Sequence, residues 1–169
     1  MKYIIFILLF IQLSCANTAN SLYEDVLRDI EAGSIDFAFM KLNNYLRDYP
    51  NSPEAPEIKF ALIEYYFQTD NYRGAIDLFT DYLIGYPEEK NHIFAQAILY
   101  RILLEYNGES ELIAELKERF FSKPIFNIFS GAKIKTYKSI LNNNYKIADS
   151  ASEIVIYKNN KPFIKVSPQ

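Results

Sequence analysis

The chain has 169 residues, of which 50% are hydrophobic, and a formal net charge of −3. A length of this order accommodates one domain with a sizeable core. With one cysteine and one histidine (His92), the composition excludes an internal disulfide and a histidine-rich metal site, and the 5 glycines form no phosphate-binding loop.

The N-terminus has the pattern of a secretion signal. Lys2 precedes an apolar run from Tyr3 to Leu13, and the small polar residue Ser14 follows it. A helix needs about 20 residues to cross a bilayer, so this run is too short for a permanent transmembrane span. We predict a signal peptide over residues 1–14.

Cys15 follows this run directly, between Ser14 and Ala16. The arrangement resembles a bacterial lipobox, in which the signal is cut before the cysteine and the cysteine is acylated. Gln12 and Leu13 depart from the usual pattern of this motif. The resemblance implies lipidation at Cys15 and a linker over residues 15–21. The alternative is an ordinary signal cleaved after Ala16 or Ala19, which would discard Cys15.

Residues 22–124 contain an internal repeat with a period of 37 residues. The recurring positions are Tyr49-Pro50, Tyr86-Pro87 and Pro124; Ala38 and Ala75; Leu42, Phe79 and Leu116; Leu46, Leu83 and Phe120; Tyr45 and Tyr82. A lattice of this kind predicts about three structural repeats.

Each repeat has the pattern of two helices. In the middle repeat, residues 56–67 and 72–86 carry apolar residues at helical spacing and are separated by a turn at residues 69–71. Proline cannot donate the backbone hydrogen bond of a helix, so we expect helix pairs to end near Pro50, Pro87 and Pro124.

The motif Leu62-Ile63-x-x-Tyr66, followed by Ala75-x-x-x-Phe79 and Pro87, resembles the tetratricopeptide repeat (TPR), with Ile63 in place of a small residue. In its long period and in the segment 48–56, the chain resembles the TPR proteins of two bacterial envelope groups. One is the outer-membrane lipoprotein that accompanies the barrel-assembly machinery, and the other is the periplasmic TPR coordinator associated with Tol-Pal.

The resemblance implies a concave groove lined by the first helix of each pair. The groove residues would be Tyr23, Phe60, Glu64, Phe67, Ala97, Arg101 and Leu104. Aromatic residues and arginine are enriched in binding hot spots. For Phe60 and Tyr23, a position in the core is an equally good interpretation.

The C-terminal region predicts a cap for the repeats. Over residues 125–148, Ile134, Tyr137, Leu141 and Tyr145 share one face of a predicted capping helix. In residues 149–169, two β-type segments flank Lys158-Asn159-Asn160-Lys161, which predicts a hairpin with asparagines at positive φ. The predicted fold is all-α: a short TPR-like solenoid with a capping helix and a small C-terminal β-hairpin.

Charge divides the chain unevenly. Residues 16–121 carry a net charge of −10, whereas residues 122–169 carry 8 lysines and 2 acids. The acidic repeats argue against nucleic acid as a partner. We expect the apolar residues of the tail to pack on the last repeat. Lys133, Lys135 and Lys138 would then form a basic patch for an anionic membrane or an acidic partner.

Together these features predict a non-catalytic scaffold or adaptor of the bacterial cell envelope, without metal or cofactor. It would be lipid-anchored at Cys15, at the periplasmic face of the outer membrane, and would bind an envelope protein or peptide in its groove. One alternative is a secreted, non-lipidated TPR subunit or regulator of an envelope complex. Another is an enzyme or solute-binding module with a site in the groove.

Overall fold

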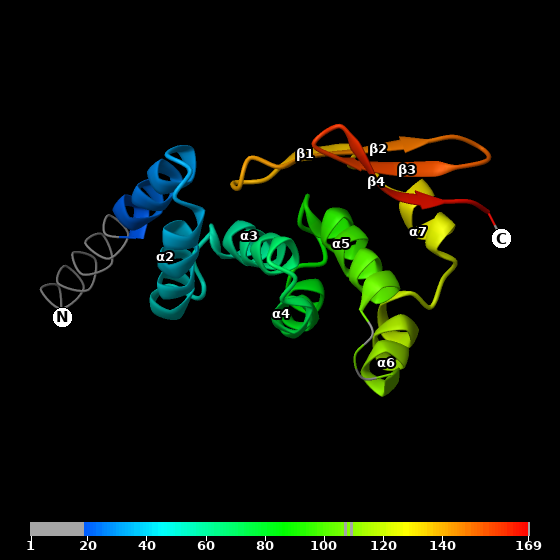
Figure 1. Cartoon of the computed structure of the whole chain (residues 1–169), viewed down its shortest axis with the longest axis horizontal. Helices are drawn as coiled ribbons and strands as arrows, with labels where there is room; N and C mark the ends of the chain where they lie inside the picture. The colour runs from blue at the N-terminus through cyan, green and yellow to red at the C-terminus, as the bar shows by residue number, and fades with distance from the viewer. Residues whose placement is uncertain (1–18, 107, 109, 169) are drawn as a thin grey trace, which may run out of the picture. The chain divides into compact units, whose positions relative to one another are not determined.

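The computed structural model describes residues 19–106, 108 and 110–168. The described residues fall into two compact units, divided between Ile58 and Lys59 and here called the first and second units. Each unit is described by itself. The predicted signal peptide (residues 1–14) and Cys15 lie outside the described residues. Figure 1 shows the order of helices and strands.

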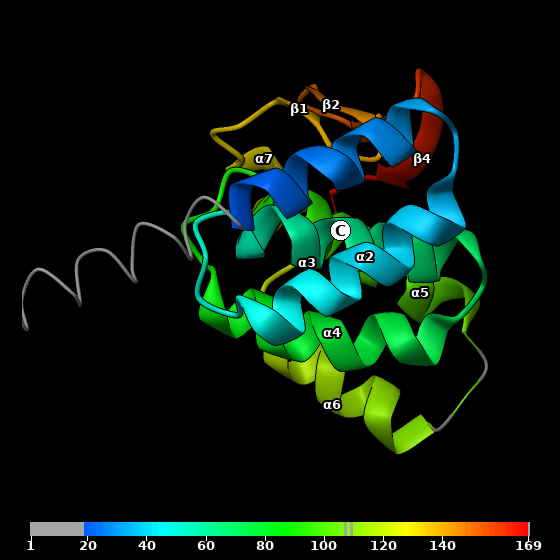
Figure 2. The same cartoon turned by 90° about the vertical axis from the view of Figure 1, so that its left-hand side faces the viewer.

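The first unit contains a helical hairpin. A helix whose described residues are 19–31 is followed by α2 (Ile35–Asp48), and the two lie side by side in Figure 2. Gly33, at φ 76°, adopts the left-handed conformation that ends many helices. The Ser34 amide donates to the Asp29 carbonyl at 2.8 Å, which satisfies a terminal carbonyl of the first helix. The chain can therefore reverse into α2 without strain.

The helices continue as consecutive hairpins through the second unit: α3 (Ala55–Gln68), which begins in the first unit, α4 (Tyr72–Gly85), α5 (His92–Glu105), α6 (Ser110–Phe120) and the short α7 (Ile125–Ser130). The side chain of Asn71 caps α4 by accepting from the Gly74 amide at 3.1 Å. As predicted, α2 and α4 end shortly before Pro50 and Pro87. The expected apolar stripe of α4 is also present, with Ala75, Phe79, Tyr82 and Leu83 buried.

Four antiparallel strands complete the second unit: β1 (Thr136–Lys138), β2 (Asn144–Asp149), β3 (Ile154–Lys158) and β4 (Lys161–Val166). They are hydrogen-bonded in sequence order. The predicted hairpin is confirmed, because β3 and β4 pair around Asn159 and Asn160, at φ 52° and 61°. Two successive positive φ angles give a turn whose twist matches that of the strands.

The capping helix predicted over residues 125–148 is wrong beyond Ser130. Only α7 is helical there, and β1 and β2 occupy most of the rest. Tyr137, Tyr145 and Ile147 are buried and alternate with exposed neighbours, which is the two-residue period of a strand. Asn142, at φ 60°, lies in the turn between the strands, where a helix cannot continue. The C-terminal element is therefore a four-stranded sheet and not a lone hairpin.

One face of the sheet forms a common core with the helices. Figure 1 shows the sheet along one side of α5, with α6 on the other side. The buried residues of this inner face are Tyr137, Tyr145, Ile147, Ile154, Ile156 and Ile164, and they belong to the same hydrophobic cluster as residues of α3, α4 and α5. This packing stabilises strands that would be only marginally stable alone.

Candidate functional site

The C-terminal sheet covers residues of the second unit for which the sequence analysis predicted an open groove. Phe60 of α3 is fully buried, and its ring centroid lies 5.3 Å from that of Tyr137 and 5.9 Å from that of Tyr145. Phe94 of α5 stacks on Tyr137 and lies 5.3 Å from Tyr145. Such aromatic pairs add about 0.5–1.5 kcal/mol each beyond the burial of their area. The sheet is therefore tightly packed on these helices.

Glu64, one turn after Phe60, is the polar centre of this contact. It is 0% exposed, and its Oε1 accepts hydrogen bonds from the Tyr145 hydroxyl at 2.6 Å and from Nδ2 of Asn143 at 3.0 Å. Burial raises the pKa of Glu64 to about 7, while the charge of Lys158 and the two hydrogen bonds act in the opposite direction. Both donors come from the tail of the same chain, and Oε2 has no hydrogen-bond partner among the described residues.

Lys158 adds a cation on the same inner side of the sheet. Its Nζ lies 5.6 Å from the ring centroid of Phe67 and 5.8 Å from that of Tyr145, distances suited to cation–π attraction. Burial lowers the pKa of Lys158, and the Glu64 charge opposes that shift. Burial also raises the pKa of the Tyr145 hydroxyl, as does the neighbouring Glu64. The cluster therefore pairs a buried acid with a cation and two neutral donors.

A second buried polar contact joins the sheet to α4. The Tyr82 hydroxyl donates to Oδ1 of Asn91, and Nδ2 of Asn91 donates to the Tyr137 hydroxyl at 3.2 Å. Asn91 is fully buried, just before α5. Because a buried amide without partners is costly, this bridge fixes where β1 lies.

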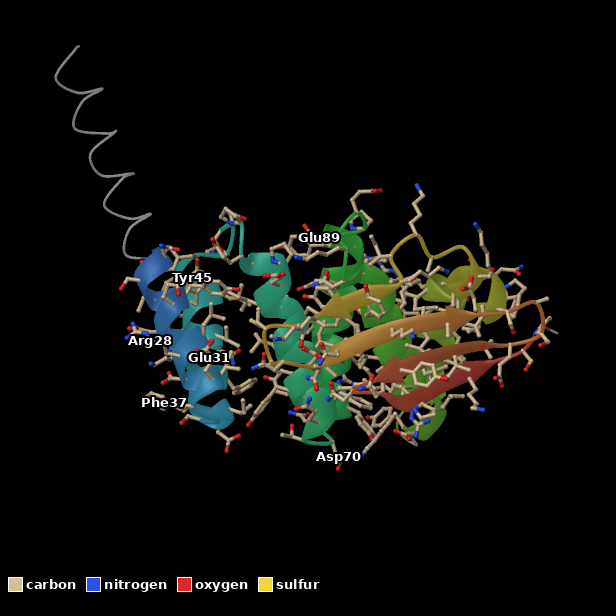
Figure 3. All side chains as sticks on the ribbon, turned by 90° about the horizontal axis from the view of Figure 1, so that it is seen from above. Arg28, Glu31, Phe37, Tyr45, Asp70 and Glu89 are labelled. Atoms are coloured by element: carbon tan, nitrogen blue, oxygen red, sulfur yellow. The ribbon has the colours of Figure 1, made fainter. Side chains whose placement is uncertain are left out.

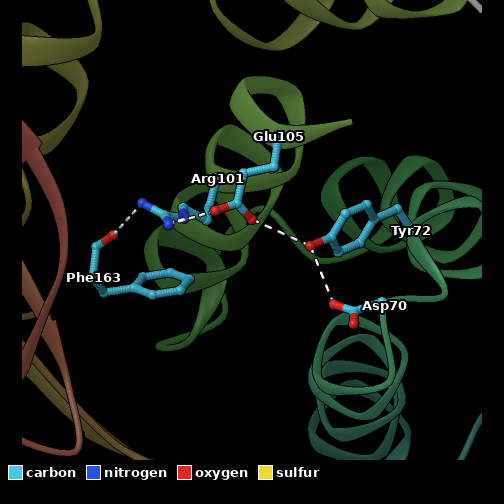
Figure 4. A network of polar contacts seen from close by, with 5 residues as sticks. All are labelled: Asp70, Tyr72, Arg101, Glu105 and Phe163. Atoms are coloured by element: carbon cyan, nitrogen blue, oxygen red, sulfur yellow. Dashed lines mark hydrogen bonds and ion pairs between the residues drawn. The ribbon is translucent and has the colours of Figure 1, made fainter. Parts of the chain in front are cut away.

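Figure 4 shows a third contact, at the edge of the sheet formed by β4. Arg101 donates from Nη1 to the backbone carbonyl of Phe163 at 3.3 Å and forms an ion pair with Glu105. The Tyr72 hydroxyl lies 3.2 Å from Oε2 of Glu105 and 3.3 Å from Oδ1 of Asp70. Arg101 thus occupies an edge carbonyl that would otherwise be open to pairing with another strand.

These contacts correct the groove prediction for the second unit. Phe60, Glu64 and Ala97 are 0% exposed, so they cannot touch a partner while the sheet is in place. Phe67 and Arg101 are partly buried against β4, and the Phe67 and Phe163 rings are 5.5 Å apart. Leu104 alone among these residues is well exposed, at 59%. The chain itself fills the face that the prediction left for a partner.

A signal for this covering is present in the sequence. The segments of α3 and α5 are apolar on nearly all sides: Phe94, Ala95, Ala97, Ile98, Leu99, Ile102 and Leu103 are all buried. A helix with one face open to water carries polar residues on that face, whereas a helix that is apolar all round is covered on all sides. Asn91 and Asn143, by contrast, carry no local signal of their role.

Tyr23, the remaining residue assigned to the groove, lies in the first unit. Its hydroxyl donates to Oε2 of Glu57 at 3.5 Å, and that of Tyr45 donates to Oε2 of Glu54 at 3.0 Å. Burial is the main cause that raises the pKa of Tyr23, and the negative charges of Glu57 and Glu54 raise it further. A pocket of about 430 Å³ lies beside Tyr45, and its other lining residues include Ala19, Tyr49, Pro50 and Pro53.

The outer surface of the first unit also carries apolar side chains. Phe37 and Met40 of α2 are 55% and 60% exposed. Figure 3 shows Phe37 at the margin of the hairpin, away from Tyr45. Single exposed apolar residues are common on protein surfaces, so they do not define a site by themselves.

The three lysines of the predicted basic patch have different surroundings. Lys133 is exposed ahead of β1, and Lys138 is exposed at the end of β1. Lys135 lies 3.0 Å from Oδ2 of Asp149, and this lysine lowers the pKa of the aspartate. Lys135 is therefore less available than the other two for an external anion.

Within the described residues, no group of three or more histidine, cysteine, aspartate or glutamate side chains could hold a metal ion. His92 begins α5, and its Nδ1 lies 3.2 Å from the Tyr86 carbonyl. Burial lowers the pKa of His92. The polar contacts described above join elements of the fold to one another.

The successive helical hairpins, with small Ala38 and Ala75 buried in equivalent helices, define a TPR-type repeat protein. Residues 15–109 match the model of the YfiO family, described as outer membrane lipoprotein, and the chain belongs to this family. The resemblance to TPR-type envelope lipoproteins is thereby confirmed. Comparisons with curated proteins and with solved structures gave no match.

The match begins at Cys15 and ends before α6, so the C-terminal sheet lies outside it. None of the helices in the described part of the chain has the length and apolar character needed to cross a membrane.

Proposed function

We propose that the chain is a non-catalytic scaffold of the cell envelope, attached to the outer membrane through acyl chains on Cys15 and exposed to the periplasm. The observation that carries this proposal is the start of the family match at Cys15, the residue directly after the predicted signal peptide. Acyl chains contribute about 0.8 kcal/mol per buried CH₂, so two or more of them give stable attachment.

Lipidation predicts a sharp difference between two variants. In cells fed an alkyne analogue of palmitate, we expect the wild-type protein to be labelled and Cys15→Ser to lose the label, because serine has no thiol to acylate. Ser14→Ala is the matched control and should keep the label. Unlabelled wild-type protein that is recovered in the soluble fraction would instead support the secreted, non-lipidated alternative.

We propose that a protein partner docks where the predicted groove remains open. Leu104 is exposed on α5, three residues after Arg101, whose guanidinium is partly exposed and paired with Glu105. An apolar side chain beside an arginine is the kind of surface that forms the centre of many interfaces. The sheet prevents a partner from reaching Phe60 and Glu64 deeper on this face.

A photo-crosslinking residue tests this docking site in intact cells. Placed at position 104, it is expected to give one discrete adduct, because a specific partner holds the same atoms near it. Ile84 of α4, 53% exposed and outside the predicted groove, is the matched control site. Equal adducts from both positions, or none from position 104, would argue against partner docking at this end of α5.

A further inference from the structure

The C-terminal sheet has a second face, turned away from the helices, and side-chain alternation determines which residues it carries. Tyr145 and Ile147 of β2 are buried, so Lys146 between them points outward. In the strand pairing, Lys146 lies opposite Thr136 on one side and Tyr157 on the other. Lys138 of β1 and Lys165 of β4 alternate with buried neighbours in the same way.

This outer face is basic. By strand pairing, the residues on this side are Thr136, Lys138, Asn144, Lys146, Ala148, Val155, Tyr157, Pro162 and Lys165, and none of them is an acid. Val155 is buried among its neighbours, and the lysines are exposed. The two acids of the region, Asp149 and Glu153, lie at one end of the sheet and pair with Lys135 at 3.0 Å and Lys165 at 3.7 Å.

Lys138 and Lys146 remain available for an external anion. Both are exposed, and no ion pair with another described residue is present for either of them. Lys133, also exposed, lies just ahead of β1. The positive charge is thus spread over several strands and does not converge on one point.

An amphipathic side chain lies among these lysines. Tyr157 is half-buried, directly opposite Lys146, and Val155 lies two residues before it on the same side. Tyrosine places an apolar ring and a polar hydroxyl at the boundary between lipid and water, and lysine can extend its ammonium toward headgroups from an apolar stem. A broad face with this composition matches a layer of headgroups better than it matches a single carboxylate.

We propose that the outer face of the C-terminal sheet binds anionic lipid headgroups, with Lys138 and Lys146 as its central contacts. This contact does not depend on acylation of Cys15. Each lysine near an anionic surface strengthens binding about fivefold at low salt, and added salt screens the effect. Without Lys2 the net charge changes from −3 to −4, so a preference for anionic vesicles must come from a local basic face.

Vesicle sedimentation tests the proposal. The protein lacking residues 1–14 and carrying Cys15→Ser is mixed with vesicles of phosphatidylcholine, with or without phosphatidylglycerol, so that neither signal nor acyl chain contributes. We expect binding to the anionic vesicles alone, weaker at near-physiological salt. The double variant Lys138→Gln/Lys146→Gln should bind more weakly by more than about tenfold.

The matched control is Lys117→Gln/Lys123→Gln, which removes the same charge from exposed positions outside the sheet. This variant should bind as the parent protein does, and circular dichroism checks that both variants are folded. An equal loss in both, or no preference for anionic vesicles, would overturn the proposal. Binding to soluble polyglutamate without binding to vesicles would overturn it in favour of an acidic protein partner.

Discussion

Ending the chain at Ala132, and so removing the sheet, is expected to abolish cooperative folding of the second unit. Six buried side chains of the inner face would be lost, from Tyr137 to Ile164, and Phe60 and Phe94 would face water. Burying one such side chain contributes about 1.5–3 kcal/mol, and domains have about 5–15 kcal/mol of total stability. Urea unfolding followed by circular dichroism should show a broad, weak transition for the truncated protein.

The control for this truncation removes only residues 167–169, which follow β4. That variant should unfold with the same midpoint and slope as the full chain. A cooperative transition in the protein ending at Ala132 would mean that the sheet is a detachable occupant of the groove. The expected loss would mean that the sheet is a permanent part of the core, and that no partner replaces it on Phe60 and Phe94.

The helical repeats could be predicted from the sequence because their signals are local. Pro50 and Pro87 mark helix ends, and Ala75 and Phe79 mark a buried stripe at helical spacing. Each of these signals acts within a few residues of its position. The period of 37 residues then identified the two-helix unit without any information about distant contacts.

The C-terminal sheet was predicted only in part, because Tyr137 and Tyr145 fit two periodicities. A spacing of eight residues keeps both side chains on one face of a helix or on one face of an antiparallel pair of strands. Asn142, Asn143 and Asn144 favour a turn between them, and this signal outweighs the helical interpretation. For the hairpin at Asn159 and Asn160, no alternative helical pattern was present in the sequence.

The buried site around Glu64 could not be predicted from local sequence. Its partners Asn143 and Tyr145 are 79 and 81 residues away along the chain. The sequence analysis assigned Glu64 to the groove, where a partner would contact it. What the sequence could not show was that the donors belong to the chain's own tail and not to a partner.

Glu64→Gln is expected to remove a pH dependence from the stability of the second unit. The pKa of Glu64 is about 7 in the folded chain, against an ordinary value of 4.5, so the folded chain binds this proton more tightly than the unfolded chain does. The contribution of Glu64 to stability is therefore greatest at low pH and falls as the pH rises from about 4.5 through about 7. A difference of this size corresponds to about 3 kcal/mol.

Glutamine keeps an oxygen that can accept from Tyr145 and Asn143, but it has no proton to lose in this range. The unfolding free energy of Glu64→Gln minus that of wild type should therefore be larger at about pH 8 than at about pH 5. Glu115→Gln, at an exposed position of α6, removes the same charge and should show no such change. His92, whose lowered pKa acts in the opposite direction, is common to all three proteins and cancels in the comparison. Parallel curves of unfolding free energy against pH for wild type and Glu64→Gln would mean that water reaches the carboxylate and that the sheet does not seal this face.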